Sequence, residues 1–139
     1  MQTYIDQVRN NIQQMCDTLV ATGKWARRDL RFGFITFRDH PPQEDTYVTR
    51  VYPFESDVKA IKSSLEKVKA EGGGDGPEAQ CDALYEALTA GWKPGSTKVA
   101  VLITDSPPHG IKEEEDGFPK GCPERASMMS PALMKMMNS

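Results

Sequence analysis

The sequence has little of what marks several classes of protein. Cysteine is scarce: Cys16, Cys81 and Cys122 are odd in number, widely spaced, and form no C-x-x-C pair. This pattern predicts reduced thiols and argues against both a disulfide framework and a structural zinc site. No apolar run approaches the length of a membrane span, and no signal peptide precedes the first helical pattern. We therefore expect an intracellular, cytoplasmic protein with no membrane span.

The sequence also lacks an excess of basic charge, with 17 lysines and arginines against 20 aspartates and glutamates. The formal net charge is -3, and no stripe of lysine and arginine runs along any segment, which argues against a nucleic-acid partner. The 139 residues show no internal repeat and no linker, and they suffice for one domain with a core but not for two. We expect a single domain over residues 1–139.

What is present is alternating helical and extended patterns. Apolar spacing predicts helices at about 2–21, 58–68 and 77–90, the first of them stopping near Gly23. Strands are predicted at 30–37 (central), 47–52 (an edge strand ended by Pro53) and 99–104 (buried and parallel). Such an order is typical of an α/β sheet with helices on both faces.

A glycine-rich loop, GGGDGPE at residues 72–78, leads into the third helix. Phosphate binding is disfavoured because the loop lacks the Gly-Lys-Ser/Thr of a P-loop and follows a helix, not a strand. Helix capping explains Gly76 as the N-cap, Pro77 as the first helical residue and Glu78 in the first turn. It leaves the glycines before Asp75 unexplained.

Asp105 ends the apolar run VAVLIT. Its carboxylate either caps the following turn or binds a hard cation such as Mg²⁺, which takes a few carboxylate oxygens. We interpret His40 and His109 as surface histidines in proline-containing loops, and the EEED run at residues 113–116 as a solvated acidic loop. A Ser106/His109 nucleophile pair lacks the strand-turn-helix elbow that such a pair requires.

With these motifs in view, residues 1–123 resemble a von Willebrand factor type A domain. The resemblance lies in GFITFRDH (33–40), GGGDGPEAQCDAL (72–84), VLITDSPPHGI (101–111) and DGFPKGCP (116–123). The combination is similar to the A domains of alpha-type protein kinases. It implies a doubly wound, Rossmann-like sheet that carries a metal-ion-dependent adhesion site, in which a bound cation takes a carboxylate of a partner protein.

Carried over residue by residue, the resemblance implies an incomplete metal site. Asp105 matches the aspartate of the third loop, and Gly76 stands where relatives have a metal-binding threonine. Asp75 is the nearest oxygen donor that could substitute. The D-x-S/T-x-S motif of the first loop would fall before Met1, so we expect a partial domain that lacks the first strand and the last. Residues 124–139 form a divergent tail.

These expectations define one leading function and two rivals. The leading one is a non-enzymatic protein-interaction module with a degraded or truncated metal site, which would use Mg²⁺ in a full-length parent and hold none in this chain. Its partner would be a protein, bound through an acidic residue, and an open sheet edge would favour self-association. The first rival is a regulatory or targeting fragment of an alpha-type serine/threonine kinase, and the second is a module with no metal role.

Overall fold

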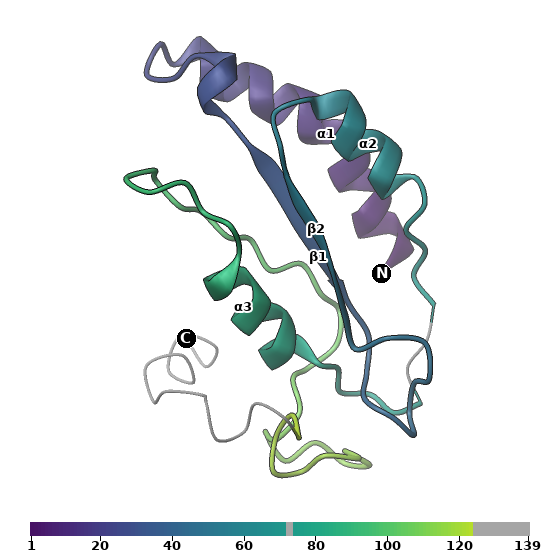
Figure 1. Cartoon of the computed structure of the whole chain (residues 1–139). Coiled ribbons are helices and arrows are strands. Elements are labelled where there is room, and N and C mark those ends of the chain that lie inside the picture. Colours follow the sequence, from purple (N-terminus) through teal and green to yellow (C-terminus); the bar gives the residue numbers. More distant parts are fainter. Residues whose placement is uncertain (72–73, 124–139) are drawn as a thin grey trace. The chain divides into compact units, whose positions relative to one another are not determined.

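The computed structural model describes residues 1–71 and 74–123 (Figure 1). Within these ranges lie α1 (Gln2–Ala21), a 3-10 turn (Arg27–Asp29), β1 (Phe32–Phe37), β2 (Thr49–Glu55), α2 (Val58–Leu65) and α3 (Gln80–Thr89). The strands form a two-stranded antiparallel sheet. The mixed α/β class is thus confirmed. The predicted tail at 124–139 and the first glycines of the glycine-rich loop lie outside the described residues.

Two compact units are each assembled from three separate segments of the chain. Among the described residues, the first contains 1–36, 51–71 and 90–104, and the second contains 37–50, 74–89 and 105–123. None of the helices in the described ranges has the length and apolar character that crossing a membrane requires.

The core of the first unit lies where α1 meets α2. Its buried residues are Ile12, Cys16, Val58, Ile61 and Leu65, with Val8, Leu30, Phe32 and Phe34 packed against them. Helical spacing places these side chains on one face of each helix, as the sequence predicts. Both helices also have clear ends: Thr22 and Gly23 (φ +71°) close α1, and the Asp57 carboxylate caps α2 by accepting the Lys59 amide at 2.9 Å.

The strands predicted at 30–37 and 47–52 are present, but their bounds and burial differ from the prediction. β1 begins two residues later than expected, and most of its side chains are half-buried rather than enclosed on both faces. Pro53 does not end β2 but lies inside it, which an edge strand tolerates because one side of that strand needs no ladder donor. Phe34 and Tyr52 stack across the two strands with ring centroids 4.1 Å apart.

The predicted buried strand at 99–104 is wrong. The segment belongs to no strand in the described part of the chain, and the side chains of Val99 and Val101 are each 71% exposed. The physical reason is pairing: a strand exists only where a neighbour accepts and donates its backbone hydrogen bonds. An apolar sequence alone does not supply that neighbour.

The predicted start of the third helix is also wrong. α3 begins at Gln80, not at Pro77, and Glu78 instead forms a parallel bridge with Pro108. The buried residues of α3 lie in its first turn, whereas Leu88 near its end is 64% exposed. The residues expected to cap the helix therefore serve a different purpose, which is to join two loops.

Replacing Ile61 tests the α1–α2 core. Ile61 is 3% exposed, so Ile61→Ala removes buried methyl groups and should lower the free energy of unfolding by about 2–5 kcal/mol. Urea unfolding followed by circular dichroism measures the change. Met15 on α1 is 49% exposed, so Met15→Ala is the matched control and should change stability by less than about 0.5 kcal/mol. Equal effects of the two substitutions would contradict this core.

Candidate functional site

Three loops of the second unit are joined by backbone hydrogen bonds. The Ala79 amide donates to the Arg38 carbonyl at 2.9 Å, and the Glu78 amide donates to the Pro107 carbonyl at 3.0 Å. The side chain of Gln80 adds a hydrogen bond to the Ser106 carbonyl. Short extended segments thereby replace the expected helix start. They bring the loops after β1, before α3 and around residue 109 into contact.

His109 lies between two carboxylates at the centre of these loops. Its Nε2 is 2.6 Å from Asp39 Oδ1 and its Nδ1 is 2.7 Å from Asp116 Oδ1, and the side chain has no exposed surface. An ionised carboxylate only accepts, so an imidazole that bonds two of them carries a proton on both nitrogens. Burial acts to lower the pKa of His109, but the hydrogen bonds with Asp116 and Asp39 outweigh it and raise the pKa.

The two carboxylates flanking His109 differ in their surroundings. Burial opposes ionisation of Asp116, but the amides of Gly110 and Phe118, each 2.8 Å away, and His109 together lower its pKa. Burial raises the pKa of Asp39, and its hydrogen bonds with the His109 ring and the His40 amide only partly offset this. Asp116 is therefore the permanent anion of the pair, and Asp39 is the carboxylate that more readily accepts a proton.

Asp75 approaches Asp39 from the glycine-rich loop. Its Oδ2 accepts the Gly117 amide at 2.7 Å, and candidate ligand atoms of Asp39, Asp75 and His109 all lie within 4.8 Å of one another. Asp39 Oδ2 and Asp75 Oδ1 are buried and accept no hydrogen bond within the described residues. A proton held between the two carboxyls would satisfy both oxygens. Because both nitrogens of His109 already serve carboxylates, this group offers a metal no imidazole lone pair.

Glu78 is a second carboxyl with an unusual environment. Burial and the nearby charge of Asp39 raise its pKa to about 7, and the attraction of His109 only partly offsets them. Its Oε2 is buried without a hydrogen-bond partner among the described residues. At neutral pH this carboxyl is therefore protonated in about half of the molecules.

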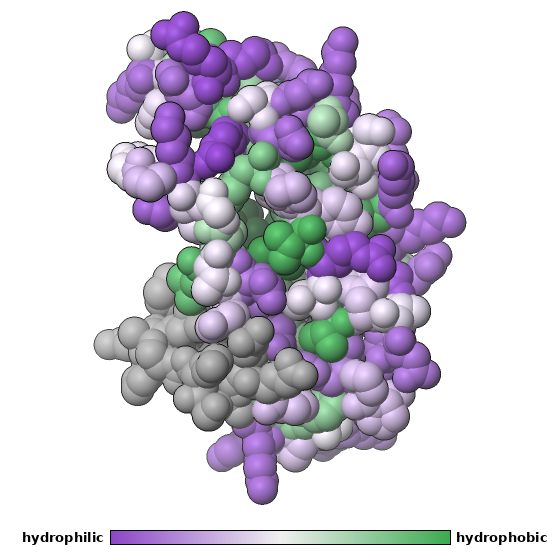
Figure 2. All heavy atoms as spheres, viewed as in Figure 1, coloured by the Kyte–Doolittle hydropathy of each residue, from purple (hydrophilic) through white to green (hydrophobic). Residues whose placement is uncertain are grey.

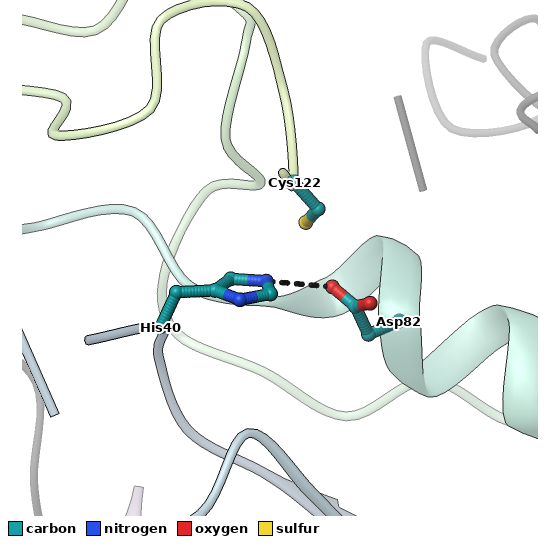
Figure 3. Close-up of side chains that lie close together, drawn as sticks. All are labelled: His40, Asp82 and Cys122. Carbon is teal, nitrogen blue, oxygen red and sulfur yellow. Dashed lines mark hydrogen bonds and ion pairs between the residues drawn. The ribbon is translucent and has the colours of Figure 1, made fainter. Parts of the chain in front are cut away.

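A separate group contains His40, Asp82 and Cys122 (Figure 3). His40 Nε2 lies 2.9 Å from Asp82 Oδ2, and one ligand atom from each of the three residues lies within 4.8 Å of the others. The exposed fractions are 5%, 4% and 1%, respectively. Phe118 covers the His40 ring edge-on, with centroids 5.3 Å apart. The group thus combines nitrogen, oxygen and sulfur donors in a site shielded from water.

Of the two aspartates predicted from the sequence as metal ligands, one lies beside His109 and the other lies at the surface. Asp75 belongs to the carboxylate group of His109, whereas Asp105 is exposed and belongs to neither group of possible ligands found among the described residues. Gly76 is exposed, and a Cβ built on it meets no atom within 4 Å. Nothing in this arrangement brings Asp105 and Asp75 together as one site, and their assignment to Mg²⁺ stays a prediction.

The interpretation of the two histidines as surface residues is wrong. His40 is 5% exposed and His109 is 3% exposed, and each is paired with an aspartate more than 40 positions away in sequence. Asp116, expected in a solvated acidic loop, has a side chain that is 1% exposed. Asp82 was not predicted as a site residue, and Glu78 was predicted only as part of a helix cap. The available signal was the proximity of aspartate to histidine in two proline-stiffened loops, but spacing along the chain cannot pair them.

Comparison with known proteins gives one relevant similarity. The chain is 29% identical over 125 residues to a protein named alpha-protein kinase vwkA from Dictyostelium discoideum. The match covers 88% of this chain and 19% of that protein, so the chain spans about a fifth of its relative's length. No family model matches the chain, and no solved structure matches it.

The raised pKa of Glu78 predicts how stability depends on pH. The folded protein keeps a proton that the unfolded chain releases between its ordinary pKa of 4.5 and the folded value of about 7. Stability is therefore fully supported below the lower value and falls as pH rises through the higher one, with a slope of at most ~1.4 kcal/mol per pH unit. Glu78→Gln keeps the shape but removes the titration, so its stability should fall less steeply over this range.

Urea unfolding at several pH values across that range measures the slope. Glu113→Gln, a change at an exposed residue, is the matched control and should behave like the wild type. Folded His109 keeps its proton above its ordinary pKa of 6.5, where the unfolded chain releases its own, so stability should keep falling there in Glu78→Gln as well as in the wild type. The raised pKa of Glu78 would be contradicted if the slope between pH 4.5 and pH 6.5 were the same in Glu78→Gln as in the wild type.

Proposed function

We propose that this chain is a non-catalytic protein-interaction module of the von Willebrand factor A type, the regulatory or targeting part of a protein related to alpha-type kinases. The sequence motifs and the similarity to a fifth of alpha-protein kinase vwkA support this origin. The proposal includes the doubly wound arrangement of the family and an intracellular location. One structural observation carries the interaction role, namely the exposure of residues 98–102.

Residues 98–102 are all exposed, and the segment is apolar after Lys98. Val99 and Val101 are 71% exposed and Leu102 is 42% exposed, and no strand of the described part of the chain pairs with them. On the face seen in Figure 2, exposed hydrophobic residues lie among hydrophilic ones. Backbone donors and acceptors beside β-branched side chains are what strand addition requires. We therefore take the partner to be an extended apolar strand of another polypeptide.

The histidine and carboxylate groups of the second unit support a structural role for that unit. His109, Asp39 and Asp116 are bonded to one another and enclosed, so they hold loops together and do not face a substrate. General acid–base catalysis requires a group within hydrogen-bond reach of a substrate proton. An interaction module needs only that its loops be held rigid.

A strand peptide tests the interaction role. The probe is a fluorescent peptide with the sequence TKVAVLIT, residues 97–104 of this chain, and fluorescence anisotropy measures its binding. We expect saturable binding that is lost in the double substitution Val99→Lys, Val101→Lys, since charged side chains on both exposed positions oppose strand pairing. Leu88→Lys changes an exposed leucine (64%) outside the segment and should bind as the wild type does.

Three outcomes would overturn the proposal. Absence of peptide binding, or equal binding by all three proteins, would remove the role of residues 98–102. Transfer of phosphate from Mg²⁺–ATP to a serine peptide by the purified chain would contradict its non-catalytic character. If the wild type self-associates in sedimentation velocity and the double lysine variant does not, then the partner strand comes from a second copy of the chain.

Mg²⁺ should bind this chain only weakly as part of the same proposal. Asp105 is exposed and stands outside the buried groups, and Gly76 offers no side-chain oxygen. Calorimetry should give a Kd weaker than ~1 mM, unchanged by Asp105→Ala. The space around Gly76 admits a threonine, so Gly76→Thr should bind Mg²⁺ at least as well as the wild type. Micromolar binding that disappears in Asp105→Ala would contradict this expectation.

A further inference from the structure

Three segments remote in sequence converge on a buried set of nitrogen, oxygen and sulfur donors. His40 comes from the loop after β1, Asp82 from the first turn of α3, and Cys122 from the last described loop (Figure 3). The sulfur of Cys122 points toward the hydrogen bond between the other two side chains. We infer that these three residues bind a Zn²⁺ ion, through His40 Nε2, one carboxylate oxygen of Asp82 and Cys122 Sγ.

The donor set selects zinc over harder cations. Imidazole and thiolate suit Zn²⁺, whereas Mg²⁺ and Ca²⁺ require mostly oxygen ligands. Bonds of ~2.0–2.3 Å in a tetrahedral site place neighbouring ligand atoms ~3.4 Å apart. In the structure all three atoms lie within 4.8 Å of one another, and the nitrogen and oxygen are 2.9 Å apart. Small side-chain adjustments therefore open the space for the ion.

Charge balance favours the metal in this buried position. A doubly positive ion with one carboxylate, one thiolate and a neutral imidazole forms a complex of zero net charge. Such a complex avoids the large cost of a net charge in a low-dielectric interior. The residues are at most 5% exposed, and Phe118 shields the imidazole. The fourth coordination position then belongs to a water molecule.

The geometry also separates this group from its neighbours. The nitrogens of His109 are both engaged by carboxylates, so its group lacks a free nitrogen ligand. Cys81 is buried and its thiol is hydrogen-bonded to Cys122, but it does not belong to the group of mutually close ligand atoms. Cys81 is therefore an internal control: a buried thiol of the same kind, next to the site, that the inference does not use as a ligand.

Metal content and spectroscopy test the inference on the full chain. The protein is stripped with a chelator, supplied with Zn²⁺, desalted and measured by elemental mass spectrometry. We expect about one zinc per chain, with affinity reduced at least tenfold in Cys122→Ser, His40→Gln and Asp82→Asn and reduced less in Cys81→Ser, which removes a thiol next to a ligand but no ligand. With Co²⁺ in place of zinc, a thiolate-to-cobalt charge-transfer band should appear in the wild type and in Cys81→Ser and be absent in Cys122→Ser.

The cobalt spectrum keeps the test decisive if a variant is unstable. Circular dichroism identifies a variant that has lost its fold, and the wild-type charge-transfer band alone then reports whether a thiolate binds the metal. The inference is overturned if the wild type retains no zinc, if it gives no charge-transfer band, or if Cys81→Ser alone removes the band. None of these outcomes affects the proposed strand-binding role, which involves residues 98–102 of the first unit.

Discussion

The buried ion triple of His109 with Asp39 and Asp116 is the interaction on which the second unit depends. A positive imidazolium held by two carboxylates at 2.6 and 2.7 Å joins a loop after β1 to the loop around residue 116. Removing one member of such a group leaves an uncompensated buried charge, which costs about 3–5 kcal/mol of stability. Replacing the whole group with apolar residues of similar volume is often neutral, so the group adds little net stability. The triple therefore acts mainly by specifying one arrangement of the loops.

Much of the first unit could be predicted from the sequence because its determinants are local. The bounds of α1 follow from apolar spacing and from Gly23, and the buried face of α2 follows from Val58, Ile61 and Leu65. The second unit could not be predicted in this way. His40 pairs with Asp82 and His109 with Asp39 across 42 and 70 positions, and periodicity carries no information about such pairs. Local rules favoured a capped helix at Gly76–Glu78, but a bridge to Pro108 prevailed there.

The two units differ in the groups that they leave without a partner. In the second unit, the buried side chains of His40 and His109 have carboxylate partners from other loops. Buried side-chain oxygens without a hydrogen-bond partner among the described residues of this unit belong to Asp39, Gln43, Asp75 and Glu78. In the first unit, an apolar segment at 98–102 remains exposed although its composition favours a buried strand. Hydrogen-bonded side chains hold the loops in place, and an exposed segment without a neighbouring strand offers another chain a place to add a strand.

Phe118 lies next to both buried histidines of the second unit. Its ring meets His109 at 4.9 Å and 84° and His40 at 5.3 Å and 66°, so one aromatic ring is edge-on to both imidazoles. Ring-current shielding depends steeply on such geometry, and the two imidazoles have different carboxylate partners. The proton resonances of this phenylalanine therefore record the state of both histidines at once, and a chemical-shift change there marks any event that moves either imidazole.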